Sequence, residues 1–531
     1  MAAAAAAVED AAVRVTAKRW ALAQFVLVLA VAILCLLLLY APRLSPPTSV
    51  AFFPASARRD GATPASAPSV PGPRVGVGNG DTEGDGGGDE LVHLDNQVGS
   101  PCASMPSHGI CCDRGDYHSD VCFMAGDVRT DPASLSLLLF PPQSPPAAAA
   151  AAGNATAGAV EERIRPYTRK WDGYITRTIH EVRLRAAPRP EEEEEEGAGR
   201  RRCDVRHDAP VFVLTAAGYS HNLFHVFNDG FLPAWLTVQH LRRRVVLAVL
   251  SYNPRWAAAY GELVAGLSEY PVVDLLRDER THCFAGAIVG TRYHDYLAVD
   301  PARLRDNKTV VDFHRFLAGA YEARGTTDEP PAPETTAALP RRPRLGIVSR
   351  KGRRVIENQA AVAALAASVG FDVDVMETAT GAPLSAVYAA VSSYDALAGV
   401  HGADLTTFLF LRPGRAALAQ IAPLGISLLS RNLFGVPAAR MGLHYEQYDI
   451  AGGESSLSRR YSPEDAVVAD PARARREQGA KEWELVEHVY LRGQNVTLDL
   501  GRFRETLSRM HSLLVQRREL HAPHVDATPQ T

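Results

Sequence analysis

The sequence has 531 residues, of which 56 are lysine or arginine and 60 are aspartate or glutamate, giving a formal net charge of −4. A chain of this length can form two or three domains with sizeable cores. The charge shows no basic excess of the kind typical of nucleic-acid-binding proteins, so we expect no nucleic-acid partner.

The first structural signal is an uncharged apolar stretch over residues 20–40. As a helix rising about 1.5 Å per residue it would span roughly 30 Å, the thickness of a bilayer's hydrocarbon core. Trp20 and Tyr40 occupy its ends, where aromatic rings favour the membrane interface, and basic residues precede it. The alternative is a cleaved signal peptide, whose apolar region is shorter, about 7–15 residues. We therefore predict a cytoplasmic tail at 1–19, a single signal anchor at 20–40 and a lumenal remainder.

Cysteine usage fits a lumenal location. Outside the apolar stretch the cysteines are Cys102, Cys111, Cys112, Cys122, Cys203 and Cys283. An even set in an oxidising compartment indicates disulfides, although the pairing cannot be derived from the sequence. Zinc binding by the cluster 102–122 with its histidines is the alternative. The adjacent pair Cys111–Cys112 does not have the C-x₂₋₄-C spacing of zinc sites, so we expect no metal there.

Residues 41–100 are rich in proline, glycine, alanine and serine, a composition that cannot bury enough apolar surface to order itself. We interpret them as a flexible stem. The glutamate-rich segment 191–202 is typical of an exposed loop insertion. Asn154, Asn307 and Asn495 each begin an Asn-x-Thr triplet, which predicts glycosylation in a lumenal protein.

From Arg163 onward, strand and helix patterns alternate. The predicted strands are 210–216, 244–251, 344–349, 371–377, 396–400, 416–422 and 443–450, and the predicted helices are 222–241, 357–369, 384–393 and 403–411. Such alternation indicates parallel sheets covered by helices on both faces, whose ligands bind at the carboxyl ends of the strands. A proline-rich break at 329–343 divides the pattern. We therefore predict an α/β fold with domains at 101–335 and 340–518, followed by a tail at 519–531.

Two motifs follow strands of the second predicted domain. Residues 349–354 read SRKGRR, and residues 400–403 read VHGA and open a helix. A helix N-terminus offers unpaired N–H groups and a positive dipole end, and arginine binds phosphate oxygens in a bidentate manner. The alternatives are an exposed basic turn and a hydrogen-bonded core histidine. The residues predicted to bind a diphosphate leaving group are Arg350, Arg354, His401, Gly402 and Ala403.

A third motif, residues 218–229, follows the first predicted strand and reads GYSHNLFHVFND. Asn222, His225 and Asp229 fall at helical spacing on one face. A histidine and an aspartate at the start of a helix suit acid–base chemistry, and we predict that His225 and Asp229 are catalytic. The alternative is a buried His–Asp pair that only orders the helix.

These motifs, in this order, resemble glycosyltransferase family 61, which is abundant in plants. Asn358 and the segment Phe410–Gly414 extend the similarity, and Cys122–Arg129 adds an upstream match, so that it covers roughly residues 100 to 518. The resemblance implies a Golgi type II membrane protein with a lumenal GT-B-like fold, in which two Rossmann-like domains face a cleft. It also implies inverting transfer from a UDP-sugar to a glycan acceptor, without a cofactor.

Activities in this family include xylosyl and arabinosyl transfer to xylan, and xylosyl or N-acetylglucosaminyl transfer to glycoprotein glycans. The composition resembles the cereal branch associated with xylan decoration, so we expect pentose transfer to xylan. Two alternatives stay open: a transferase acting on glycoprotein glycans, and a non-catalytic carbohydrate-binding subunit of a Golgi complex.

The sequence departs from the family pattern at Asp404 and Thr407, where the family usually has glycine and asparagine. A carboxylate at position 404 would repel a donor diphosphate if it pointed inward, and we expect Asp404 to face away. The Asp-x-Asp triplet 372–374 is similar to a metal–nucleotide motif of another glycosyltransferase fold. Its strict alternation instead indicates a half-exposed strand, so we predict no metal site there.

Overall fold

The computed structural model describes residues 94–140, 161–187, 202–322, 341–377 and 382–521, all of them within the unit Val50–Thr531. The predicted tail 1–19, the signal anchor 20–40, the greater part of the stem, the sequon at Asn154 and most of the glutamate-rich segment lie outside the described residues. Within those residues, no helix has the length and apolar character needed to cross a membrane.

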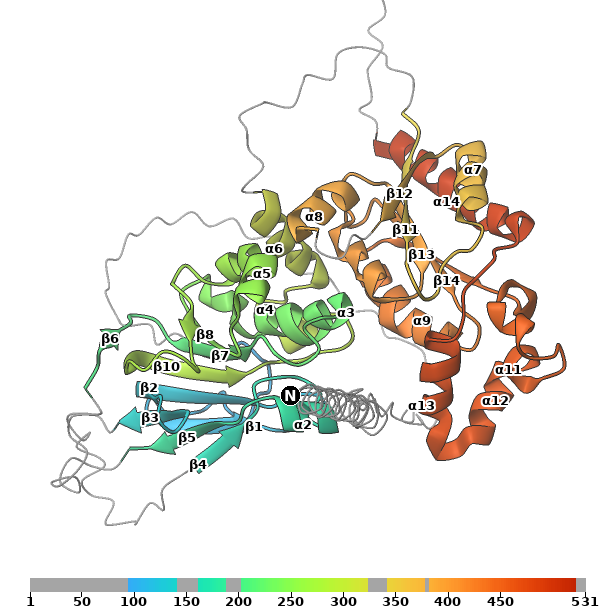
Figure 1. The fold of residues 1–531 in the computed structure, drawn as a ribbon. Helices are drawn as coiled ribbons and strands as arrows, with labels where there is room; N and C mark the ends of the chain where they lie inside the picture. The colour runs from blue at the N-terminus through green and yellow to red at the C-terminus, as the bar shows by residue number, and fades with distance from the viewer. Residues whose placement is uncertain (1–93, 141–160, 188–201, 323–340, 378–381, 522–531) are drawn as a thin grey trace, which may run out of the picture. The chain divides into compact units, whose positions relative to one another are not determined.

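A mixed ten-stranded sheet organises the described chain up to residue 322 (Figure 1). Its strands are β1 (Gly109–Asp113), β2 (Val121–Asp131), β3 (Ser136–Phe140), β4 (Glu161–Ile164), β5 (Val182–Ala186), β6 (Val205–Arg206), β7 (Val211–Thr215), β8 (Val246–Leu250), β9 (Val273–Asp274) and β10 (His282–Gly290). The order is β4-β5-β3-β2-β10-β7-β8-β9, with β1 beside β2 and β6 beside β10. Strand β2 is antiparallel to β1, β3 and β10, whereas β10, β7, β8 and β9 run parallel.

The prediction of a wholly parallel sheet beginning near Arg163 is therefore wrong for this half. Three strands precede that residue, and they pair antiparallel through short connections. They therefore lack the alternation of strands and helices on which the prediction depended. The prediction of helices on both faces is wrong as well. One face buries a cluster that includes Met124, Leu139, Val213 and Ala248 and contains no helical residue, because strands of the same sheet cover it.

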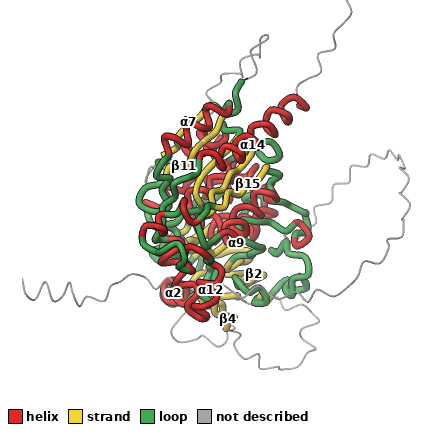
Figure 2. The backbone as a smooth tube through the Cα atoms, turned by 90° about the vertical axis from the view of Figure 1, so that its right-hand side faces the viewer, coloured by secondary structure: helices red, strands yellow, loops and turns green. Residues whose placement is uncertain are grey.

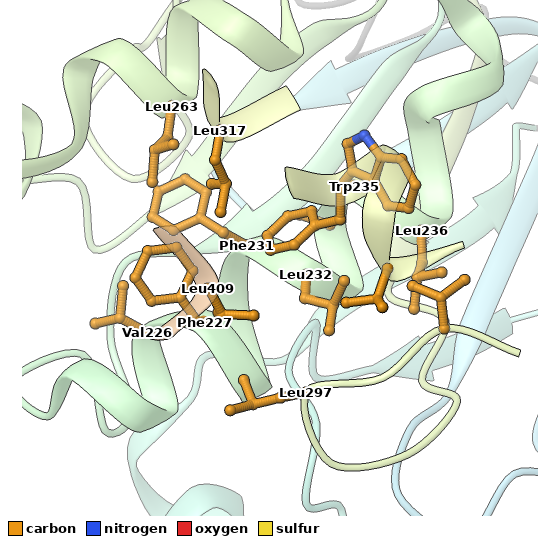
Figure 3. Packing of buried hydrophobic residues seen from close by; sticks show 14 of the residues in the cluster. Val226, Phe227, Phe231, Leu232, Trp235, Leu236, Leu263, Leu297, Leu317 and Leu409 are labelled. Carbon is orange, nitrogen blue, oxygen red and sulfur yellow. The ribbon is translucent and has the colours of Figure 1, made fainter. Parts of the chain in front are cut away.

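Helices cover the other face of this sheet. They are α3 (Leu223–His225), a π-helix (Val226–Phe231), α4 (Leu232–Val238), a 3-10 turn (Gln239–Leu241), α5 (Pro254–Leu267), a 3-10 turn (Pro301–Arg303) and α6 (Val310–Glu322). Helix α2 (Gly173–Thr178) packs separately, with its Ile175 against Tyr167 and Tyr219. The predicted helix 222–241 thus exists as one continuous helical segment with a π-helical turn inside it. Its apolar side chains, together with Leu263 of α5, pack onto the sheet (Figure 3).

The second sheet is wholly parallel, as the sequence predicts. Its strands are β11 (Arg344–Ser349), β12 (Asp372–Glu377), β13 (Ala396–Val400), β14 (Ala417–Ala422) and β15 (His444–Asp449), in the order β12-β11-β13-β14-β15. This is the 2-1-3-4-5 order of a doubly wound sheet, in which the chain reverses direction between β11 and β13. Ligands of such sheets bind at that switch point, outside the carboxyl ends of the strands.

Helices cover both faces of the second sheet, again as predicted. One face packs against α7 (Gln359–Val369) and α14 (Leu500–His521), which Figures 1 and 2 show on one side of the strands. The other packs against α8 (Leu384–Ser392), a 3-10 helix (Ala403–Phe410) and α10 (Val436–Arg440). The remaining helices are α9 (Ser427–Ser430), a π-helix (Arg431–Gly435), α11 (Ala466–Ala469), α12 (Pro471–Gln478), α13 (Glu482–Leu485), a π-helix (Val486–Leu491) and 3-10 turns at Gly452–Glu454, Ser456–Arg459 and Gly479–Lys481.

One apolar core joins the helical layers of the two sheets. The ring of Phe410, at the end of the 3-10 helix, lies 5.9 Å from the ring of Phe227 and 5.9 Å from that of Tyr321 in α6. Leu409 also meets the side chains of the segment 226–236 and Leu317 (Figure 3). The two halves are therefore in direct apolar contact, and burial of this surface holds the two helix starts described below at fixed positions.

The six cysteines outside the apolar stretch form three disulfides: Cys102–Cys111, Cys112–Cys122 and Cys203–Cys283. The first two fasten the segment before β1 to β1, and β1 to β2. The third fastens the segment before β6 to β10. Because these cysteines are bonded to one another, the cluster 102–122 has no thiolate with which to bind zinc.

The end of the predicted stem is packed rather than flexible. Asp95 is 8% exposed and forms an ion pair with Arg292, which also binds Asp113 at 2.5 Å and the hydroxyl of Ser100 at 3.0 Å. Composition could not reveal this packing, because the partner is an arginine almost two hundred positions later. The buried guanidinium thus ties the segment 94–100 and strand β1 to the loop after β10.

Replacing Arg292 tests this tie. R292M leaves two carboxylates with little solvent access and no cation, so we expect it to reduce the free energy of unfolding by about 3–5 kcal/mol. R473M removes an exposed pair with Glu477 and should cost at most about 1 kcal/mol. Urea unfolding of the purified full chain measures both, and equal effects for the two variants would contradict the proposed tie.

Candidate active site and family

The His225–Asp229 pair lies just beyond the carboxyl end of β7. Nδ1 of His225 is 2.5 Å from Oδ2 of Asp229, at the turn where α3 passes into the π-helix. Such π-helical turns are frequent at functional sites. Asn222, the third member of the predicted polar face, caps α3 instead, accepting a hydrogen bond from the backbone N–H of Phe224 at 3.0 Å.

Asp229 is 2% exposed and is held by residues from an earlier part of the chain. Its carboxylate accepts hydrogen bonds from Thr168 Oγ1 at 2.7 Å and Asn228 Nδ2 at 3.1 Å, and Arg169 Nε lies at 3.3 Å. Burial by itself raises the pKa of Asp229, but the charge of Arg169 and the hydrogen bonds from His225 and Thr168 outweigh it. The pKa of the carboxyl is therefore held well below its usual range.

This environment separates the roles of the two predicted catalytic residues. A buried, permanently ionised and fully hydrogen-bonded carboxylate is a poor proton acceptor, so Asp229 orients its neighbour. Because it accepts the Nδ1 proton of His225, it leaves Nε2 as the basic nitrogen, the arrangement found in Ser-His-Asp triads. The His225 side chain is 16% exposed, so solvent and a bound molecule can reach it. The adjoining cavity of about 30 Å³ has room for little more than one water.

Arg350 and Arg354 lie at the predicted place, after the carboxyl end of β11. The exposed residues of the same turn point outward: Lys351 is 81% exposed and pairs with Glu377. By contrast, the Arg354 Nε is buried and has no hydrogen-bond partner among the described residues. Burial and the charge of Arg350 lower the pKa of Arg354 to about 9, so its guanidinium stays charged at neutral pH.

Arg354 also adopts a left-handed backbone conformation, with φ of 52°. This conformation is uncommon for a residue with a side chain and is often retained at functional sites. The Arg354 backbone N–H donates to the carbonyl of Gln494 at 3.0 Å, which holds the turn in place. A cation whose buried Nε has no partner among the described residues, on a strained turn, indicates a site for an anion.

His401 follows the carboxyl end of β13, across the switch point from Arg350. It is 4% exposed, and its Nδ1 accepts a hydrogen bond from Gln420 Nε2 at 2.9 Å. Burial, with the charges of Arg354 and Arg350, lowers the pKa of His401 well below its usual value. The imidazole is therefore neutral and carries its proton on Nε2, which is available to donate to a ligand oxygen.

Gly402 and Ala403 open the helix predicted at 403–411, which is a 3-10 helix. A Cβ at Gly402 would lie 2.3 Å from Nη1 of Arg350. The guanidinium of Arg350 thus packs against this glycine, and a side chain here would have to displace it. The sequence instead led us to expect close approach of a phosphate at this point. Ala403 packs against the shared apolar core.

Asp404 does not face away as we expected. Its Oδ2 lies 2.7 Å from Nη1 of Arg350, so the carboxylate sits where a phosphate oxygen would meet that guanidinium. The reason is local: position 404 is in the first turn of the 3-10 helix, directly after the glycine on which Arg350 packs. Thr407, the other departure from the family pattern, is fully buried and donates to the Asp404 carbonyl at 2.8 Å.

Phe434 connects the two groups of residues. Its ring lies 5.7 Å from that of Phe224, the neighbour of His225, and 5.2 Å from the imidazole of His401. The acid–base pair and the arginine turn therefore belong to one region of the molecule. Sequence reasoning missed Phe434, because a phenylalanine in a helical stretch is usually a core residue. It also gave no role to Thr168 or Arg169.

The other predicted sites are placed as follows. Triplet 372–374 lies in β12 at the sheet edge, where Asp374 accepts a hydrogen bond from Tyr394. Within the described residues, no three His, Cys, Asp or Glu side chains gather in a way that could hold a metal ion. Asn307 is exposed. Asn495 hydrogen-bonds to the Val355 N–H and to Glu357, so its amide is engaged in the fold, which argues against glycosylation there.

Sequence comparison identifies the family. The profile described as Glycosyltransferase 61 matches residues 221–418, a range that contains every predicted catalytic and diphosphate-binding residue. The chain is 35% identical over 420 residues to xylan glycosyltransferase MUCI21 of Arabidopsis thaliana, covering 78% of this chain and 81% of that protein. The chain belongs to glycosyltransferase family 61.

Further relatives from Oryza sativa subsp. japonica fit this assignment. Beta-1,2-xylosyltransferase XYXT1 is 35% identical over 415 residues, covering 77% of this chain and 85% of the relative. Alpha-1,3-arabinosyltransferase XAT3 is 31% identical over 398 residues, covering 75% and 64%. The predicted membership in family 61 is thus confirmed. As a member of the family, the chain is a glycosyltransferase that uses a sugar donor and a glycan acceptor.

The hydrogen bond from Thr168 offers a test of the Asp229 environment. T168V removes a bond to an ionised carboxylate, and we expect it to cost about 1.5–3 kcal/mol of unfolding free energy at pH 7. T176V removes an exposed bond to a carbonyl and should have a much smaller effect. Urea unfolding of both variants and the native chain measures these losses of unfolding free energy.

The same effect should depend on pH. The folded-state pKa of Asp229 lies below the unfolded value of about 3.9. The stabilisation is therefore present above about pH 4 and is lost as the pH falls through the folded-state pKa. At pH 3 the folded-state carboxyl is still ionised, because its pKa is held well below the usual range, so the difference between T168V and the native chain should persist there, and a difference that disappears at pH 3 would contradict the ionised state of Asp229.

Proposed function

We propose that this protein is an inverting, UDP-sugar-dependent transferase that adds a pentose, xylose or arabinose, to xylan. The observation that carries the chemistry is the oriented His225–Asp229 pair in one region with a partnerless arginine and a neutral histidine. The assignment of a pentose donor and a xylan acceptor rests on the names of the relatives, which are a xylan glycosyltransferase, a xylosyltransferase and an arabinosyltransferase. Sugar transfer from a nucleotide diphosphate sugar requires a base for the acceptor hydroxyl and a pocket for the anionic leaving group.

We further propose a GT-B-like arrangement, with an acceptor-side domain at 101–335 and a nucleotide-sugar domain at 340–518. The doubly wound order of the second sheet supports this assignment, because its switch point separates the turns that carry Arg350 and His401. The carboxyl end of β7 supplies His225 from the other half. Donor and acceptor would then meet in a cleft between the carboxyl ends of the two sheets.

In the mechanism that we propose, Nε2 of His225 takes the proton of an acceptor hydroxyl as its oxygen attacks the anomeric carbon. Asp229 keeps the imidazole in the required tautomer and stabilises its charge. The bond from the anomeric carbon to the diphosphate breaks on the opposite side, which inverts the configuration. Arg350, Arg354 and the Nε2 proton of His401 stabilise the negative charge that develops on the leaving UDP.

The proposed location is the Golgi lumen, with residues 20–40 as a signal anchor and residues 41–93 as a tether. The three disulfides support an oxidising compartment, because such bonds persist in the secretory pathway and are rare in the cytosol. Exposure of Asn307 in a turn is compatible with glycosylation there.

One observation favours a second candidate, a non-catalytic carbohydrate-binding Golgi subunit. The ion pair between Asp404 and Arg350 occupies part of the diphosphate pocket with a negative charge. We favour an active enzyme, because Arg354 and His401 remain available and the Asp404 side chain, at 29% exposure, has room to turn outward. Release of UDP from UDP-xylose or UDP-arabinose in the presence of xylo-oligosaccharides separates the two candidates.

The role of His225 predicts a loss of turnover without a loss of donor binding. In H225A the kcat for pentose transfer should fall by about 10²–10⁴-fold, the usual contribution of a positioned base, while the Kd for UDP stays the same. H221A alters an exposed histidine of the same loop and should transfer normally. Transfer assays and calorimetric UDP titrations measure both quantities, and a fully active H225A would refute the assignment.

The Asp404–Arg350 pair predicts an effect in the opposite direction. If the carboxylate competes with the donor diphosphate for Arg350, D404N should tighten UDP binding by about threefold to tenfold. D372N neutralises a carboxylate on the edge strand β12 and should leave the affinity unchanged. Weaker binding by D404N would mean that Asp404 positions Arg350 for the donor instead of competing with it.

A further inference from the structure

A second basic cavity lies at the opposite edge of the parallel sheet from the proposed donor pocket. It has a volume of about 200 Å³, and its charged lining residues are Arg341, Asp395, Arg412, Arg415, Arg517 and Arg518. They come from the segments just before β11, β13 and β14 and from the last turns of α14 (Figure 1). Because the strands are parallel, these segments share the amino-terminal edge, away from the turns that carry Arg350 and His401.

The carboxylate among the described residues that line this cavity already accepts several hydrogen bonds from the protein. Asp395, whose side chain is 10% exposed, accepts from Arg412 Nη2 at 2.8 Å, from Arg518 Nη2 at 2.5 Å and from the backbone N–H of Arg344 at 2.8 Å. Among the described residues that line the cavity, five carry guanidinium groups and one carries a carboxylate. Like charges this close repel one another, and a bound anion would relieve the repulsion.

Two of the arginines are not committed to Asp395. The Arg415 side chain is exposed and has no ion pair among the described residues, and Arg517 donates to the Gly414 carbonyl at 3.2 Å. Leu514, which is 3% exposed, forms an apolar part of the wall. The cavity therefore combines fixed guanidinium forks, additional cations and a small apolar surface in a concave site.

We propose that this cavity binds a phosphate-bearing ligand at a site separate from the donor pocket. Guanidinium groups bind phosphate oxygens in a bidentate manner, and five guanidinium groups around one cavity favour a dianionic phosphate over a single carboxylate. The concave shape suits a phosphate group carried by a small molecule or a lipid headgroup, with carbon atoms against Leu514. The site does not depend on the proposed transferase reaction, because it shares no residue with it.

The experiment titrates the purified full chain in detergent with inorganic pyrophosphate as the probe. Calorimetry measures the binding affinity. The R350Q/R354Q variant removes the contribution of the donor pocket and should retain one pyrophosphate site. Adding R415Q/R517Q should weaken the remaining binding by about tenfold or more, the loss expected for charge-assisted hydrogen bonds. These two substitutions leave the arginines that bind Asp395 in place, and unfolding curves check that the fold is kept.

A matched control carries R473Q/R476Q, which removes two exposed arginines of α12 and changes the net charge equally. Its pyrophosphate affinity should be unchanged. Equal affinity in the R415Q/R517Q and control variants, or no binding once the donor pocket is removed, would overturn the proposal. Flotation with phosphatidate and phosphatidylcholine vesicles identifies the source of the phosphate. Pocket-dependent binding to phosphatidate alone indicates a lipid, and pyrophosphate binding without flotation indicates a soluble ligand.

Discussion

The contact between two helix starts is the constraint on which the proposed site depends. The segment beginning at Leu223 and the 3-10 helix beginning at Ala403 bury their apolar faces in one core, with Phe227 against Phe410. His225 and Asp229 lie within the first of these segments, and His401 and Gly402 directly precede the second. Packing of the helix bodies therefore fixes the distance between the acid–base pair and the anion-binding turns, without any direct bond between the two groups. A close-packed core transmits position in this way because it has little room to adjust.

A buried charge ties the same site to the antiparallel half of the first sheet. Asp229 stays ionised at 2% exposure because Thr168 and Arg169, which follow strand β4, reach across to it. Removing a carboxylate from water is costly unless a cation and hydrogen bonds replace the solvent. Strand β4 thus does more than complete a sheet, because it leads into the segment with the arginine that keeps Asp229 negative and His225 in one tautomer.

The second sheet could be predicted from the sequence and half of the first could not, for a physical reason. Strands β11, β13 and β14 are short apolar runs separated by helices, a pattern that only a covered parallel sheet satisfies. Antiparallel strands such as β2 obey pairing rules set by residues far away in sequence. The site residues that lie at strand ends could be predicted from the sequence, because the topology of the sheet sets their positions. Phe434, Arg169 and the direction of Asp404 depend on side-chain contacts between distant segments, which no local pattern encodes.

At the two edges of the parallel sheet, clustered arginines pair with carboxylates that differ in burial, and this difference bears on function. At the amino edge, Asp395 is buried and saturated, so it is a permanent part of the fold. At the carboxyl edge, the carboxylate that pairs with Arg350 in the described part of the chain is Asp404, which is 29% exposed and lies in the first turn of a 3-10 helix. A counter-ion in that position can leave without breaking the core. In the proposed donor pocket, Arg350 is thus held by a group that a diphosphate would displace, while Arg354, which has no ion pair among the described residues, would attract the diphosphate throughout.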